Sequence, residues 1–205
     1  MLASLRFLSR LPIPYDEKTP LPDFQKQAQA FPLAGLVIAL PACLVASLSI
    51  WLGLHSLAVG LLAVATTIIV TGALHEDGLA DVADGFCVGH GLERKLEIMR
   101  DSTIGTYGTL ALLHCVALTA AMMSQPVTVL SPLQFSIAIV ASAGLSRAAM
   151  LWPWVSMDNV RPRASTPGTK AKDEAGLSAR FGLPDDTTLR MTLVISLLPE
   201  HRLTK

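Results

Sequence analysis

An acidic block at residues 75–85 has the clearest chemical character in the chain. It reads His-Glu-Asp-Gly-Leu-Ala-Asp-Val-Ala-Asp-Gly and spaces Asp77, Asp81 and Asp84 at i, i+4 and i+7. On a helix of about 3.6 residues per turn, these three carboxylates share one face, within roughly 60° of each other. Like charges stacked in this way repel unless a partner neutralises them.

A divalent cation is the partner that best suits this face. Mg²⁺ binds one or two protein carboxylates together with waters and substrate phosphate oxygens. Asp77, Asp81 and Asp84 therefore predict a magnesium site, and Asp81 and Asp84 are also catalytic candidates. The alternative is a solvated helix end without metal. An EF-hand fits poorly, because its alternating ligands and closing glutamate are missing. His75, beside the acids, is a candidate general base or a hydrogen-bonded packing residue.

A second polar cluster follows at residues 99–108, Met-Arg-Asp-Ser-Thr-Ile-Gly-Thr-Tyr-Gly. Asp101 adds a carboxylate, as a further ligand or as the base. Arg100 offers a planar donor fork for phosphate, and Ser102 could cap the next helix or help to hold an anion at its N-terminus. An N-cap with a nearby charge pair explains Asp101 and Ser102 equally well.

Arg147 is a single charge inside an otherwise apolar run. It lies about eight residues, or ~12 Å of helix, from the expected cytoplasmic end of that run. An arginine within a membrane needs a carboxylate or phosphate partner, which makes Arg147 a candidate substrate-binding residue. A structural ion pair with one of the aspartates is the alternative.

Membrane-spanning helices are the elements expected to position these residues. The chain has 205 residues, 51% of them hydrophobic, a mean hydropathy of +0.50 and no net charge. No Asp, Glu, Lys or Arg occurs between Gln27 and His75, a length that fits two passes of about 20 residues. The small break at residues 53–56 divides this run into spans at 31–54 and 56–74.

A second charge-free run, from Ser102 to Ser146, predicts two more spans, at 106–123 and 133–154, separated by a breaker cluster at 124–132. The expected fold is an all-α, polytopic integral membrane protein with four full spans in two hairpins. We expect one membrane domain, composed of an interfacial segment (1–26), a first hairpin (27–75), a cytoplasmic acidic site segment (76–105), a second hairpin (106–156), a cytoplasmic loop (157–187), and an incomplete fifth apolar segment with a tail (188–205).

Charge placement predicts the orientation. Two hairpins put the N-terminus, the acidic block and residues 158–187 on one side, together with most lysines and arginines, and the positive-inside rule assigns that side to the cytoplasm. Residues 1–14 resemble a signal peptide, but Arg6 and Arg10 interrupt the apolar stretch and no small-residue cleavage site follows. We therefore expect a short interfacial helix there. The lipid bilayer is a partner, no nucleic acid is expected as one, and a homo-oligomer stays open.

The motifs together resemble cobalamin synthase, the adenosylcobinamide-GDP ribazoletransferase family of bacterial and archaeal membranes. The acidic block followed by Arg100-Asp101-Ser102 is the most specific part of the resemblance. It also covers Phe7-Leu8-Ser9-Arg10-Leu11-Pro12-Ile13-Pro14, Phe31-Pro32-Leu33-Ala34-Gly35, Ile104-Gly105-Thr106-Tyr107-Gly108, Ser146-Arg147 and, more weakly, Gly176-Leu177-Ser178-Ala179-Arg180-Phe181.

The resemblance implies a Mg²⁺-dependent enzyme of the bacterial cytoplasmic (inner) membrane, with its active site on the cytoplasmic face. It implies the joining of adenosylcobinamide-GDP to α-ribazole or its 5′-phosphate, with release of GMP, late in the biosynthesis of cobalamin. A CDP-alcohol phosphotransferase is the enzymatic alternative, although its Asp-x-x-Asp-Gly-x-x-Ala-Arg spacing differs from the one found here. A transporter or non-catalytic scaffold is the other, although transporters usually place such residues near the bilayer midplane.

Two features depart from the family pattern. Thr103 stands where the family usually has an arginine, which removes one expected phosphate contact. Family members also continue through further spans with a late Gly- and Asp-containing block. Here the run Met191–Leu198 is about eight residues long, whereas a crossing needs roughly 20. We therefore expect a C-terminally truncated chain, and the segment around residues 161–180 is either a mobile linker or a substrate lid.

Overall fold

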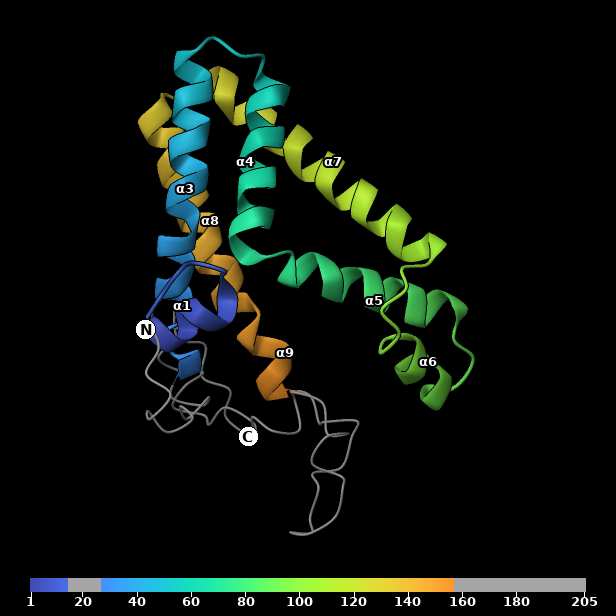
Figure 1. Ribbon diagram of the computed structural model, residues 1–205. Helices are drawn as coiled ribbons and strands as arrows, with labels where there is room; N and C mark the ends of the chain where they lie inside the picture. The colour runs from blue at the N-terminus through green and yellow to red at the C-terminus, as the bar shows by residue number, and fades with distance from the viewer. Residues whose placement is uncertain (15–26, 157–205) are drawn as a thin grey trace, which may run out of the picture. The chain divides into compact units, whose positions relative to one another are not determined.

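The structure is a computed structural model that describes residues 1–14 and 27–156. Within these residues the chain is all-helical, as expected, and no strand occurs. The loop at 157–187 and the incomplete fifth apolar segment lie outside the described residues. The helices are α1 (Leu2–Leu8), α3 (Phe31–Trp51), α4 (Ser56–Thr71), α5 (Leu74–Val88), α6 (Leu92–Ile98), α7 (Thr106–Val129), α8 (Pro132–Ala149) and α9 (Leu151–Ser156) (Figure 1).

Several of these helices are long and apolar enough to cross a membrane. Three candidates stand alone: α3, α7, and the stretch Pro132–Pro153, which joins α8 to the start of α9. A fourth exists if α4 and α5, which are bent by 92° at their junction, form one span. The all-helical class and the presence of candidate membrane spans are thus confirmed for the described part of the chain, and the count of four full spans stays a prediction.

The first two spans end earlier than expected. α3 begins at Phe31 and ends at Trp51 rather than Leu54, where the turn with Gly53 at φ +71° takes over. α4 ends at Thr71 rather than Leu74, because the next two residues both adopt left-handed backbone conformations. Its 16 residues rise about 24 Å, less than the ~30 Å of a hydrocarbon core.

The third span runs six residues past its expected end at Met123. Pro126 lies inside α7 and lacks the N–H that would bond the carbonyl one turn earlier. The helix nevertheless continues to Val129, where the Leu130 N–H donates to the Pro126 carbonyl at 2.8 Å. The expected break at 124–132 is therefore confined to Leu130 and Ser131, since proline is better tolerated in helices of this kind than in soluble ones.

The described residues divide into two compact units. One contains Met1–Phe7 and the described parts of Pro12–Val37 and of the stretch that starts at Ala141, and the other contains Leu8–Leu11 and Ile38–Val140. In the first unit, the Ser4 hydroxyl donates to the Gln27 carbonyl at 2.9 Å, and the rings of Phe7 and Phe31 stack with centroids 6.0 Å apart. The helix expected near the N-terminus is present as α1, and its position at a membrane surface stays a prediction.

In the second unit, α4 packs against α7 (Figure 1). The crossing is close because Gly60 has no side chain, and a Cβ there would clash with the Ala120 carbonyl oxygen. Next to it, α3 contacts α8 through Ser47 and Ser136, whose hydroxyls are 3.2 Å apart. Contacts therefore link helices of the two expected hairpins, which ties the hairpins together.

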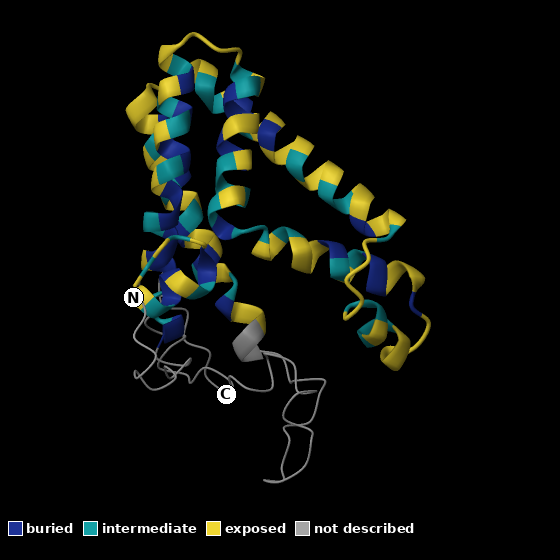
Figure 2. Ribbon diagram, in the orientation of Figure 1, coloured by how far each residue is buried: buried dark blue, intermediate teal, exposed yellow. Residues whose placement is uncertain are grey.

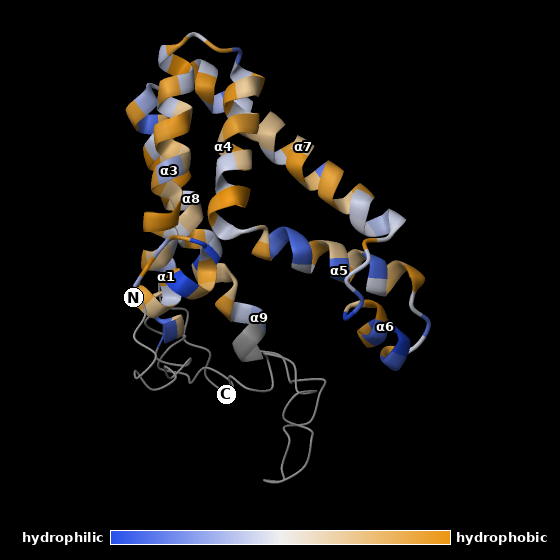
Figure 3. Ribbon diagram, viewed as in Figure 1, coloured by the Kyte–Doolittle hydropathy of each residue, from blue (hydrophilic) through white to orange (hydrophobic). Residues whose placement is uncertain are grey.

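The surface of α7 suits a hydrocarbon environment. Its large apolar side chains are mostly exposed, among them Leu113, Leu118 and Met122, each more than 60% exposed. Figure 2 shows α7 as mainly exposed, and Figure 3 shows the same helix as mainly hydrophobic, while hydrophilic residues gather on α5 and α6. Exposed apolar area of this extent needs a lipid or protein neighbour.

Candidate active site

A sharp corner between α4 and α5 determines where the acidic block lies. Gly72 (φ 65°, ψ 34°) and Ala73 (φ 59°, ψ 22°) are both left-handed. The Gly72 N–H donates to the Ile69 carbonyl and the Ala73 N–H to the Ile68 carbonyl, at 3.2 and 2.9 Å, which is a Schellman closure of α4. The chain then leaves at 92°, so the acids lie on a separate helix rather than along α4.

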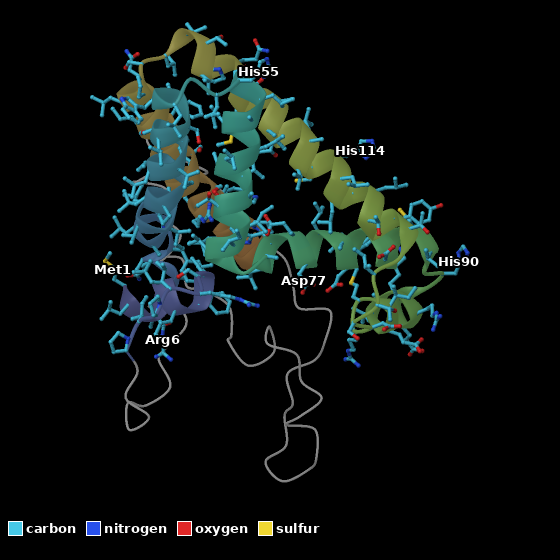
Figure 4. The ribbon with its side chains drawn as sticks, turned by 45° about the horizontal axis from the view of Figure 1, so that its top comes forward. Met1, Arg6, His55, Asp77, His90 and His114 are labelled. Atoms are coloured by element: carbon cyan, nitrogen blue, oxygen red, sulfur yellow. The ribbon has the colours of Figure 1, made fainter. Side chains whose placement is uncertain are left out.

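The three aspartates lie on one helix, as predicted, but in three different environments. Asp77 is exposed and projects from α5 in Figure 4, Asp81 is half-buried, and Asp84 is buried with 6% exposure. Partial burial, and then the negative charges of Asp77 and Asp84, raise the pKa of the Asp81 carboxyl above its ordinary range. The expected repulsion among the acids is therefore present, and it acts on Asp81.

Asp84 caps the N-terminus of α7. Its Oδ2 accepts a hydrogen bond from the Gly105 N–H at 2.7 Å, and its Oδ1 accepts one from the Gly108 N–H at 2.9 Å. Gly105 is the N-cap residue of α7, and no side chain of its own caps the helix. Asp84 thus satisfies two orphan N–H groups and places a negative charge at the positive end of the helix dipole.

The two glycines make this approach possible. A Cβ on Gly105 would lie 2.5 Å from Oδ1 of Asp84, and one on Gly108 would clash with Oδ2. Sequence reasoning missed both residues, and the available signal was the pair of small residues at i and i+3 directly after the Arg-Asp-Ser cluster. It considered Ser102 as a cap for this helix, but Ser102 lies three residues before the helix boundary and Asp84 performs the capping.

Helix α6 packs against α5 and so places the second polar cluster, residues 99–108, next to α5. Met99 packs against Gly85, where a Cβ would lie 2.8 Å from its side chain, and Lys95 Nζ lies 4.4 Å from the ring centroid of Phe86. This α5–α6 pair sets residues 99–105 beside the C-terminal half of the acidic helix. The two clusters that the sequence singled out therefore belong to one local structure.

Within this segment Arg100, Asp101 and Ser102 are all exposed. Asp101 Oδ1 accepts a hydrogen bond from the Thr103 N–H at 3.0 Å. The hydrogen bonds from the backbone and side chain of Thr103, with a smaller contribution from the charge of Arg94, hold the pKa of the Asp101 carboxyl below its ordinary range. Asp101 is thus an ionised, accessible carboxylate, and Thr103 helps to keep it so.

Arg147 belongs to the other compact unit. It is buried, with 8% exposure, and its Nη1 lies 3.0 Å from Ser146 Oγ and 3.4 Å from the Ala143 carbonyl oxygen. A Cβ on Gly35 of α3 would lie 3.0 Å from Cδ of Arg147, so the glycine leaves room for the arginine side chain. His75 is exposed in the first turn of α5. The substrate role of Arg147 and the acid–base role of His75 stay predictions.

The acidic helix offers two carboxylates to a metal. In the part of the chain that the structure describes, no three His, Cys, Asp or Glu side chains gather into a group that could hold a metal ion. Mg²⁺ needs only one or two carboxylates besides waters and substrate oxygens. Asp77 and Asp81 fit that need, whereas both oxygens of Asp84 already accept N–H groups. The three-aspartate ligand set stays a prediction.

Comparison with known proteins decides the family. A family model described as cobalamin-5-phosphate synthase matches residues 1–198. The chain belongs to the cobalamin synthase family. Several curated relatives in bacteria are named adenosylcobinamide-GDP ribazoletransferase. No solved structure matches the chain.

Relatives in the cobalamin synthase family align over most of the chain. The one from Allorhizobium ampelinum is 39% identical over 195 residues, which cover 95% of this chain and 70% of the relative. The one from Sinorhizobium medicae is 43% identical over 181 residues, covering 87% and 69%, and the one from Azorhizobium caulinodans is 42% identical over 183 residues, covering 85% and 69%. The family named from the motifs is therefore confirmed.

Proposed function

We propose that this chain is an adenosylcobinamide-GDP ribazoletransferase. It joins adenosylcobinamide-GDP to α-ribazole or its 5′-phosphate, and gives adenosylcobalamin or its 5′-phosphate and GMP. The observation that carries the proposal is the family match over residues 1–198, which includes the acidic helix and the 99–108 segment beside it.

The reaction is a phosphoryl transfer. A hydroxyl oxygen of the ribazole ribose forms a bond to the phosphorus that carries the corrinoid aminopropanol arm. The bond from that phosphorus to the oxygen of GMP breaks, and GMP leaves with the bonding pair. The hydroxyl proton goes to a base. The protein's task in such a reaction is to position the two substrates and to stabilise negative charge on the transferring phosphate.

The exposed residues of the second unit suit these tasks. Asp101, an accessible carboxylate, and His75 are the two candidate bases. Arg100 supplies a guanidinium fork to a phosphate and Ser102 a hydroxyl, both from the segment beside α5. Arg147, which lies in the other unit, stays a candidate substrate-binding residue. Asp84, as the buried cap of α7, fixes the 99–108 segment against α5 rather than contacting substrate.

Mg²⁺ is part of the proposal. Asp77 and Asp81 would hold it, and when bound it would shield charge on the diphosphate and stabilise charge on the departing GMP. Burial, and then the charges of Asp77 and Asp84, raise the pKa of Asp81, and a cation there would relieve the repulsion between these charges.

The placement in the bacterial inner membrane is also proposed. α3, α4, α7 and α8 would form four spans, with α5 and α6 on the cytoplasmic side. The 92° corner and the charges of α5 and α6, which carry six carboxylates, one arginine and one lysine between them, support a position outside the bilayer. The choice of the cytoplasmic side rests on the positive-inside rule. Substrates from the cytosol would then reach the acidic helix without entering the bilayer.

The test measures GMP release by the purified chain, reconstituted in liposomes and supplied with adenosylcobinamide-GDP, α-ribazole 5′-phosphate and Mg²⁺. We expect release that EDTA stops and that Asp81→Asn abolishes. Glu93→Gln is the matched control, since Glu93 is an exposed carboxylate on α6 that we assign no role. A folded chain that releases no GMP would refute the activity, and release that EDTA does not affect would refute the metal.

A further inference from the structure

Arg10 lies at the corner from which the acidic helix departs. It belongs to the same compact unit as α4 and α5, although about 60 residues of sequence separate it from them. Its backbone N–H donates to the Val70 carbonyl at 2.8 Å, in the last turn of α4. One of the carbonyls that α4 leaves unpaired at its end is therefore satisfied by the N-terminal segment.

The side chain of Arg10 lies across Gly72. A Cβ on Gly72 would lie 2.7 Å from Cδ and 2.8 Å from Cγ of Arg10, and would clash with Nε. Glycine is thus needed here for two reasons, its left-handed backbone and the arginine stem above it. The guanidinium carries positive charge to the C-terminal end of α4, where the helix dipole favours it.

The corner needs an external support. Ala73 has φ 59°, and it is the only described non-glycine residue with positive φ. A residue with a Cβ persists in this conformation only when its surroundings hold it there. The Schellman closure supports it from α4, and Arg10 contacts the neighbouring Val70 and Gly72 from outside the two helices.

We infer that Arg10 is a positioning residue that holds the 92° corner and thereby sets the direction in which α5 presents Asp77 and Asp81. The inference rests on the proposed function for its catalytic consequence, but the corner itself can be measured without turnover. Cys87 lies about 21 Å along α5 from Ala73, so a change of about 15° at the corner would move it by ~5 Å.

Electron paramagnetic resonance distances between α4 and α5 test the corner directly. One spin label is placed on Cys87, which is exposed, and the other on Leu61→Cys, on the exposed surface of α4. Cys43 and Cys115 are replaced by alanine. We expect a narrow distance distribution in the parent protein and in Arg10→Lys, whose stem also covers Gly72. In Arg10→Ala we expect the mean to shift by about 5 Å or the width to double.

A second variant tests the contact from the glycine side, with a glycine far from the corner as its control. Gly72 and Gly53 have similar φ, +65° and +71°, but nothing lies within 4 Å of a Cβ on Gly53. Gly72→Ala should disturb the α4–α5 distance as Arg10→Ala does, and Gly53→Ala should leave it unchanged. If Arg10→Ala fails to fold, the α4–α5 distance distribution of Gly72→Ala still tests the inference.

Kinetics provide a second readout. With the corner loosened, substrate phosphates still meet the same charged groups but in a less favourable arrangement. We expect kcat to fall about tenfold or more in Arg10→Ala, with KM changed less than about threefold, and Arg10→Lys to restore most of it. An unchanged distance distribution in Arg10→Ala and Gly72→Ala would overturn the inference, whether or not the protein is active. An altered distribution in a parent protein without transferase activity would overturn only the proposed function.

Discussion

Oδ1 of Asp84 lies 2.9 Å from the backbone nitrogen of Gly108 and accepts its hydrogen bond. Together with the bond from Gly105 at 2.7 Å, this contact makes one carboxylate of the acidic helix the cap of a candidate membrane span. Three aspartates that look equivalent in the sequence therefore have two kinds of task. Two are accessible enough for a ligand, and the third joins α5 to α7.

Asp84→Asn should destabilise the protein more than it changes substrate binding. The amide keeps one acceptor oxygen but turns an NH₂ group toward a backbone N–H. Because hydrogen bonds to a charged group contribute about 1.5–3 kcal/mol, we expect a loss of ~2 kcal/mol in the free energy of unfolding. Reversible unfolding in mixed micelles measures it. Hydrogen exchange should speed up at the Gly105 and Gly108 amides, and unchanged exchange there would contradict the cap.

Asp81→Asn should have the opposite profile. It removes a carboxylate whose pKa is raised by partial burial and by its two neighbours, so folding loses no favourable interaction. We expect turnover to be abolished while the free energy of unfolding stays within about 0.5 kcal/mol of the parent value. Asp77→Asn should likewise abolish turnover and preserve membrane insertion. Full GMP release in both variants would remove the metal assignment.

Gly108→Ala should destabilise the protein, because its Cβ would clash with Oδ2 of Asp84. The carboxylate would have to withdraw and give up its bonds, and we expect a loss of about 1–3 kcal/mol. Gly78→Ala on α5 is the control. Nothing lies within 4 Å of a Cβ there, and alanine favours a helix by about 1 kcal/mol over glycine. If Gly108→Ala were as stable as Gly78→Ala, the close approach would be wrong.

The Asp101 carboxyl should titrate below its ordinary pKa of about 3.9, because the Thr103 hydrogen bonds favour its charged form. A pKa depressed by folding contributes stability that is present above the unfolded value and is lost as pH falls through the folded value. Carbon-13 NMR of the carboxyl follows the titration. Thr103→Ala keeps the N–H and removes the hydroxyl, so the pKa should move partway back. An ordinary pKa for Asp101 in the parent protein would refute its hydrogen bonds with Thr103.

Charge-free runs and aspartate spacing were enough to predict the long helices and the acidic face. α3 starts at the predicted residue, and Asp77, Asp81 and Asp84 do share one helix. These features depend on local sequence alone, because hydrophobic length sets a span and helical period sets a face.

The features that were not predicted depend on residues distant in the sequence. The corner at Gly72 involves Arg10, and the capping of α7 depends on Asp84, 21 residues before Gly105. Periodicity cannot show such contacts. The early end of α4 is similar, since Ala73 has no preference for a left-handed backbone and adopts it in this tertiary setting. Because proline weakens a helix, the sequence predicts a break at residues 124–132, yet α7 continues past Pro126.

The contact between Asp84 and α7 also bears on how the protein is made. The ribosome synthesises α5 before α7, so the acceptor for the first turn of α7 already exists when that helix emerges. Until α5 has folded, the Gly105 and Gly108 amides have no carboxylate to bond. The first turn of α7 can therefore be capped only after both α5 and Gly108 have left the ribosome, which links the order of synthesis to the order in which these two helices can join.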